Sequence, residues 1–108
     1  MVDVNKQDPD GLNAFWIAAR LGHGDVCRAL AEYGVDIYNA DKNYNNALHI
    51  SARSKDLYGI LRMLVLSNYD LDLQNIDGDT ATHIAAGRGN FRHLKLMVDE
   101  GSDIDTLN

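Results

Sequence analysis

Apolar and polar residues follow one another along this chain in a pattern that occurs three times. Each copy has a polar turn, an apolar, alanine-rich stretch about two helical turns long, a break, and a second stretch, which in the first two copies has apolar residues at i, i+1, i+4 and i+5. This spacing is typical of one face of an α-helix, and no segment shows the sustained alternation of a strand. The pattern predicts three pairs of short helices. The apolar positions of the second helix are Val26, Cys27, Leu30 and Ala31 in the first copy and Ile60, Leu61, Leu64 and Val65 in the second.

The three copies align at a nearly constant spacing. Residues 11–19, 44–52 and 78–86 share one pattern, at offsets of 33 and then 34 residues. The extra residue falls in the middle copy, around Ser54, Lys55 and Asp56. A helix pair of this length cannot bury its apolar face alone, so we expect the copies to stack around one shared core.

Local signals mark where the helices begin and end. Polar residues that favour N-caps precede the first helix of each copy: Asn13, Asn46 and Thr80. Residues that accept a left-handed backbone are expected to end the helices. These are Gly22 and Gly89 after the first helix, and Gly34, Asn68 and Gly101 after the second.

These residues resemble the ankyrin repeat, whose consensus reads D-x-x-G-x-T-P-L-H-x-A-A-x-x-G-H. The consensus is matched by Asp8, Gly11, Ala18, Ala19, Gly22 and His23, by Asp41, Ala47, Leu48, His49 and Ala52, and by Gly78, Thr80, Ala81, Thr82, His83, Ala85, Ala86 and Gly89. The resemblance implies an all-α fold, an ankyrin-type α-solenoid of stacked helix-turn-helix repeats with short β-turn or hairpin fingers. We divide the chain into residues 1–7, the tail of a preceding repeat, and repeats at 8–40, 41–74 and 75–108.

Several positions depart from the consensus. Trp16 replaces the motif histidine of the first copy. Tyr44 replaces the turn glycine of the second, so we expect that turn to differ in backbone conformation. His93 takes the place of Val26 and Ile60, where it is either a hydrogen-bonded, partly buried side chain or faces a missing repeat.

The two ends of the chain lack the atypical polar caps that usually close such arrays. Residues 3–5 align with residues 36–38 at an offset of 33, as the tail of an earlier repeat would. We therefore expect an excerpt of a longer array, with apolar area exposed at both ends and a tendency to self-associate.

Composition narrows the class of partner. The chain has 108 residues, 45% of them hydrophobic and 24% charged, which suits one soluble globular domain. Its net charge of −6 argues against nucleic-acid binding, which needs a basic face. The lone Cys27 cannot form an internal disulfide, and we find no signal peptide and no membrane-spanning stretch. We expect an intracellular protein, cytoplasmic or nuclear, with no membrane insertion.

The search for chemistry yields no catalytic, metal or cofactor site. The resemblance implies that His49 and His83 brace the turns and that His23 is the consensus histidine after the inter-helix glycine. A calcium loop built around Gly78 would place leucine and isoleucine at essential ligand positions, and the glycine-rich segments 22–24 and 87–90 follow no strand. Cys27 lies on an apolar helix face, where a thiol is expected to be inert. We predict no enzyme and no cofactor.

A partner surface is implied by the resemblance, since the family binds through the fingers and the exposed face of the first helices. The predicted partner-binding residues are Asp10, Leu12, Trp16, Arg20, Leu21, Lys42, Asn43, Tyr44, Asn45, Arg53, Ile76, Asp77, Asp79 and Arg88. Arg20, Arg53 and Arg88 occupy one repeated position and are either a ladder for acidic groups or ordinary solvated helix ends. Trp16 is either a binding anchor or a cover for the end of the stack.

The function predicted from the sequence is a protein–protein interaction module that binds a partner protein or peptide on a concave face. One alternative is a structural or regulatory segment of a larger enzyme or channel that contacts its own chain. Another is a small-molecule or metal binder with the histidines as ligands, which a zinc titration would test.

Overall fold

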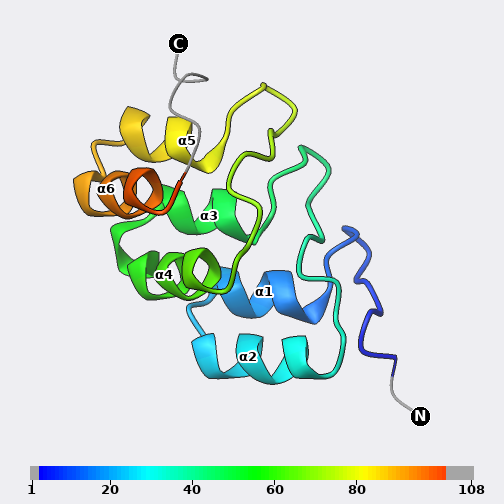
Figure 1. The fold of residues 1–108 in the computed structure, drawn as a ribbon. Coiled ribbons are helices and arrows are strands. Elements are labelled where there is room, and N and C mark those ends of the chain that lie inside the picture. Colours follow the sequence, from blue (N-terminus) through cyan, green and yellow to red (C-terminus); the bar gives the residue numbers. More distant parts are fainter. Residues whose placement is uncertain (1–2, 102–108) are drawn as a thin grey trace.

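The computed structural model describes residues 3–101, which form three helix pairs (Figure 1). The sequence positions 1–2 and 102–108, which include the end of the predicted third repeat, lie outside the described residues. The helices are α1 (Ala14–Arg20), α2 (Gly24–Glu32), α3 (Ala47–Arg53), α4 (Tyr58–Leu66), α5 (Ala81–Gly87) and α6 (Phe91–Asp99), with a 3-10 turn η1 (Lys55–Leu57) before α4. Within residues 3–101 there is no strand, so the all-α prediction is confirmed.

The helix pairs stack in two rows. Each first helix packs on its own second helix, and α1, α3 and α5 lie side by side, as do α2, α4 and α6. The segments that precede α1, α3 and α5 all project from the same side of the stack (Figure 1). We call the turns at residues 8–12, 41–45 and 75–79 the fingers. The predicted α-solenoid is therefore confirmed, with extents of 45 × 25 × 21 Å.

One apolar core runs through the three units. Ala19, Ala52 and Ala85 are fully buried where neighbouring first helices meet, since small side chains let helices approach closely. Larger side chains of the second helices, among them Leu61 and Met97, fill the space between the rows. No helix in residues 3–101 is long and apolar enough to cross a bilayer.

The apolar face predicted for α2 is only partly buried. Ile60 is 3% exposed and lies against Gly24 of the preceding unit. The matching Val26 is 48% exposed, because no described helix covers α2 on that side. The predicted exposure of apolar area therefore holds for this end of the stack.

The helix ends follow the sequence signals. The side chains of Asn13, Asn46 and Thr80 each accept a hydrogen bond from a backbone N–H in the first turn of α1, α3 and α5. Positive φ angles occur at the expected helix ends, which are Gly22, Gly34, Asn68, Gly89 and Gly101. In the middle unit the extra residue is accommodated by an extended Ser54 and the η1 turn.

The finger at residues 41–45 corrects one prediction. Tyr44 has φ 61°, in the same left-handed region as Gly11 (82°) and Gly78 (81°). Its N–H donates to the Asp41 carbonyl at 2.9 Å, as the Gly11 N–H does to the Asp8 carbonyl. The expectation of a different turn was wrong, because the finger hydrogen bonds hold the tyrosine in a conformation that costs a bulky residue about 1–2 kcal/mol.

Replacing Tyr44 with glycine is therefore expected to stabilise the chain by about 0.5–1 kcal/mol, after the added flexibility of the unfolded glycine is subtracted. The side chain is 63% exposed, so little packing is lost. Urea unfolding followed by circular dichroism measures the change. Asn43→Gly is the matched control, since Asn43 is exposed and has no positive φ, and glycine there should destabilise. If the Y44G chain were less stable than wild type, the left-handed conformation of Tyr44 would not be a source of strain.

Candidate partner-binding surface

The three fingers have the same internal hydrogen bonds. In each, one side-chain oxygen accepts two backbone N–H groups: Asp8 from Asp10 and Leu12, Asp41 from Asn43 and Asn45, and Asn75 from Asp77 and Asp79, all at 2.9–3.0 Å. Such a turn uses the short Asx side chain in place of a backbone partner. The fingers are therefore held by their own residues before any partner is bound.

Neighbouring fingers are also joined to each other. The Ile76 N–H donates to the Asn43 carbonyl at 2.9 Å, and the Asn75 side-chain amide donates to the Asn45 side-chain oxygen at 2.9 Å. Asn75 and Asn45 are both buried. The second and third fingers therefore form one continuous surface.

The motif histidines brace the fingers, as the resemblance implied. His49 is 1% exposed, and its Nδ1 accepts the Asn46 N–H at 3.1 Å. Its Nε2 lies 3.0 Å from the carbonyls of Asp79, on the next finger, and of Leu73, on the segment that leads to it. His83 closes the same capping box with Thr80. These histidines are part of the framework rather than ligands on its surface.

Trp16 has the same bracing role in the first unit. Its indole Nε1 donates to the Asn45 carbonyl at 2.8 Å, on the second finger, and the residue is 5% exposed. It therefore lies between the first two fingers. Neither interpretation made from the sequence describes it, because the ring is not an exposed anchor and does not cover the end of the stack.

The other predicted partner-binding residues fall into a buried group and an exposed group. Leu12 (9% exposed) and Asn45 (5%) are buried with Trp16, so we leave these three out of the candidate surface. The residues with exposed side chains are Asp10, Arg20, Leu21, Lys42, Asn43, Tyr44, Arg53, Ile76, Asp77 and Arg88, and Asp79 is partly exposed. These eleven residues define the candidate surface.

The candidate surface carries an exposed apolar pair beside acidic residues on the fingers and arginines at the helix ends. Tyr44 and Ile76 are 63% and 59% exposed, and they lie on adjacent, hydrogen-bonded fingers flanked by Asp77 and Asp79. Arg20 and Arg53 end α1 and α3, and Arg88 follows α5. Because these helices lie side by side, the three arginines occupy corresponding ends of neighbouring helices. The Arg20 guanidinium also lies 5.5 Å from the centre of the Trp16 ring, within cation–π range.

His93, the unusual histidine of the second helices, faces the middle unit. It is 2% exposed and its Nε2 lies 2.9 Å from the Ser54 carbonyl, which makes it a donor. The sequence left two roles open for His93, a hydrogen-bonded side chain or one that faces a missing repeat. The structure shows the first of these. Sequence reasoning could not choose between them, because its partner is a backbone carbonyl of the non-repeating insertion.

The buried histidines make stability depend on pH. Burial lowers the pKa of both His49 and His93 below the ordinary value. The unfolded chain therefore binds more protons than the folded chain as the pH falls through about 6.5, and stability is lost. We expect the free energy of unfolding to decrease from pH 7.5 to 5.5, by at most about 1.4 kcal/mol per pH unit for each proton.

Urea unfolding at a series of pH values measures this dependence. His93→Ile, the residue type at the matching position 60, should make the slope shallower. His23→Gln is the control, because His23 is exposed and its side chain caps no helix. If the free energy of unfolding were equal at pH 7.5 and 5.5, His49 and His93 would not both be buried in the neutral form.

The described residues bring together no reactive or metal-binding cluster. Residues 3–101 contain no group of three His, Cys, Asp or Glu side chains placed to hold a metal ion. Cys27 is fully buried, and burial raises the pKa of its thiol to about 11, which leaves it protonated and unreactive near neutral pH.

Comparison with known proteins gives matches along the whole chain. A family model described as "Ankyrin repeats (3 copies)" matches residues 1–75, and one described as "Ankyrin repeat" matches residues 77–108. The mouse "B-cell lymphoma 3 protein homolog" is 28% identical over 99% of the chain. The rat "Protein phosphatase 1 regulatory subunit 12A" is 33% identical over 98% of it, and the Drosophila melanogaster "NF-kappa-B inhibitor cactus" is 30% identical over 92%.

The chain corresponds to a small part of each of these relatives. The matched region covers 24% of the mouse protein, 10% of the rat protein and 19% of the Drosophila protein. The similarity therefore concerns the repeats, and the remaining parts of these relatives have no counterpart in this sequence.

Proposed function

The chain belongs to the ankyrin repeat family, and on this premise we propose that it is a non-catalytic module that binds a partner protein on its candidate surface. The observation that carries the proposal is the exposed pair Tyr44 and Ile76 on two fingers that are hydrogen-bonded to each other. A rigid surface with exposed apolar groups loses little conformational entropy on binding.

The strain at Tyr44 supports a binding role for this residue. An exposed tyrosine in a left-handed turn lowers stability where glycine would not. Backbone strain of this kind tends to be retained at functional sites, and tyrosine is a favoured residue in the centre of interfaces. Two relatives carry names that describe action on other proteins, a regulatory subunit of protein phosphatase 1 and an inhibitor of NF-kappa-B. We infer the same general role, protein binding, for this chain.

A quantitative affinity purification tests the proposal. The purified chain is immobilised, incubated with lysate of its source cells, and compared with the variant Y44G/R20A/R53A by mass spectrometry. Tyr44→Gly is chosen because it removes the exposed ring while it is expected to stabilise the fold. Loss of a partner therefore cannot be attributed to unfolding caused by this substitution. We expect specific partners to fall by at least about tenfold, since the loss of one central interface residue costs about 2 kcal/mol and about 1.4 kcal/mol is a factor of ten.

The control variant changes the opposite row of helices. Arg28→Ala and Arg62→Ala remove two exposed charges of α2 and α4, as R20A and R53A do in α1 and α3. Partners that bind the candidate surface should survive in this control. If every partner is retained by the Y44G/R20A/R53A variant, the assignment of the surface is wrong.

A further inference from the structure

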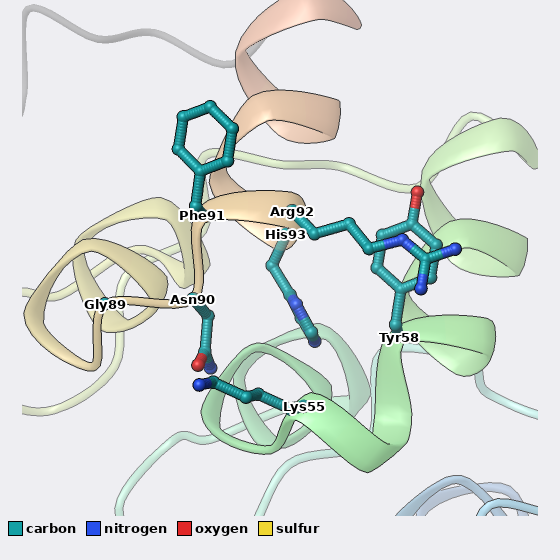
Figure 2. Close-up of a pocket in the computed structure, with 7 residues that line it drawn as sticks. All are labelled: Lys55, Tyr58, Gly89, Asn90, Phe91, Arg92 and His93. Atoms are coloured by element: carbon teal, nitrogen blue, oxygen red, sulfur yellow. The ribbon is translucent and has the colours of Figure 1, made fainter.

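A cavity of about 410 Å³ opens where the middle and third units meet (Figure 2). Its lining residues come from the turns between α3 and α4 and between α5 and α6 and from the starts of α4 and α6, and these turns lie at the opposite end of the helices from the fingers (Figure 1). Its lining includes Lys55 and Tyr58 from the middle unit and Asn90, Arg92 and His93 from the third. None of these residues belongs to the candidate surface described above. The cavity therefore lies outside that surface.

Two irregular features of the middle unit line the cavity. Lys55 belongs to the η1 turn, which accommodates the extra residue of the middle unit. Tyr58 occupies the position that glycine occupies in the first unit, at Gly24. The first unit has neither the extra residue nor the tyrosine, so the cavity does not follow from the repeat itself.

The walls of the cavity are fixed by contacts within the chain. The Arg92 guanidinium lies 3.8 Å from the centre of the Tyr58 ring, which it covers in Figure 2. His93 meets the same ring edge-on at 5.3 Å and donates to the Ser54 carbonyl. The Asn90 side-chain amide donates to the Ala52 carbonyl at 2.9 Å. The side chains are therefore ordered before a ligand arrives, which lowers the entropic cost of binding.

The cavity is positively charged in an acidic protein. Lys55 and Arg92 are exposed, and no carboxylate lines the cavity. The ion pairs among residues 3–101 are Arg28 with Asp25 and Lys95 with Asp99, so neither cavity cation is paired. The chain as a whole carries a net charge of −6. This local reversal of sign favours an anionic ligand at this place.

We propose that the cavity binds an aspartate or glutamate side chain of an extended acidic segment in a partner protein. Arg92 presents a planar guanidinium over the Tyr58 ring, and the N–H groups of a guanidinium match a carboxylate in pairs. Lys55 adds a second charge. Two exposed arginines lie next to the cavity in the sequence. Arg53 is two residues before Lys55, and Arg88 directly precedes Gly89, which also lines the cavity. Cations thus continue beyond the cavity, which suits successive carboxylates of a peptide better than a single small anion.

The test measures binding of a fluorescein-labelled hexaglutamate peptide to the purified chain by fluorescence anisotropy. We expect saturable binding that weakens at least about fivefold in K55Q/R92Q, since two charge-assisted contacts are removed. K6Q/R62Q is the control, because it changes the net charge equally at exposed positions elsewhere. Circular dichroism of each variant checks that it is folded. Equal weakening in both variants would overturn the proposal, because binding would then be general attraction.

Two further comparisons distinguish a carboxylate site from simple charge attraction and from a site for small anions. Arg92→Lys keeps the charge and removes the planar group, so its affinity should lie between those of wild type and K55Q/R92Q. Wild-type affinity in R92K would refute the paired contact. Inorganic phosphate should displace the peptide only at a large excess, whereas displacement at equal concentration would identify a small-anion site and reject an acidic segment as the ligand. The substituted residues, Lys55 and Arg92, lie outside the candidate surface, so a failure here leaves the assignment of Tyr44 and Ile76 to that surface untouched.

Discussion

Replacing Trp16 with alanine is expected to destabilise the chain by about 3–5 kcal/mol. The indole is 5% exposed and donates to the Asn45 carbonyl at 2.8 Å. The substitution removes a large buried ring, leaves a cavity between the first two fingers, and takes the hydrogen-bond donor from a buried carbonyl. Small domains have total stabilities of about 5–15 kcal/mol, so the urea midpoint, followed by circular dichroism, should fall by about a fifth or more.

Trp16→His is the matched control for this prediction. At the corresponding position of the next unit, His49 reaches the Asp79 carbonyl, which matches the carbonyl that Trp16 contacts. Histidine at position 16 should therefore retain a bracing hydrogen bond and cost clearly less than alanine. If W16A were as stable as the wild type, the indole would have to lie on the surface, as the sequence alone had suggested.

Much of the fold could be predicted because it depends on local signals that occur three times. Asn13, Asn46 and Thr80 cap their helices by short-range hydrogen bonds, and these depend on residue type and position alone. The buried alanines follow in the same way from the repeated need for close helix contact. Tyr44 shows the limit of such reasoning. Residue preference argued against a left-handed turn, whereas the hydrogen bonds of the finger impose it.

The candidate surface could be predicted less well, because exposure depends on neighbouring units. Leu12, Trp16 and Asn45 occupy positions implied for binding, yet all three are buried, and Trp16 and Asn45 are hydrogen-bonded to the adjacent finger. The charged cavity at Lys55 and Arg92 was missed entirely, although the sequence held two signals. These were the extra residue in the middle copy and a tyrosine where the first copy has glycine. Irregularities in a repeat deserve the same scrutiny as the repeat, because they produce the sites that its consensus does not describe.

Replacing His49 with alanine is expected to cost about 3 kcal/mol or more, the second largest effect. The imidazole accepts the Asn46 N–H through Nδ1, so its proton is on Nε2, which faces the carbonyls of Leu73 and Asp79. Each buried group left without a partner costs about 1–3 kcal/mol, and the lost ring leaves a cavity. The third finger should loosen first, because two of these partners lie on it or on the segment leading to it. Amide hydrogen exchange of residues 75–80 and urea unfolding measure the two effects.

His23→Ala is the control for the histidine itself, since His23 is exposed and its side chain caps no helix. It should change stability by less than about 0.5 kcal/mol. His49→Gln tests the bracing more closely, because its amide can supply one donor and one acceptor without the ring. It should recover part of the loss, through whichever finger contact the longer side chain still reaches. A His49→Ala chain with wild-type stability and unchanged exchange at residues 75–80 would mean that the fingers are held by their own turns alone.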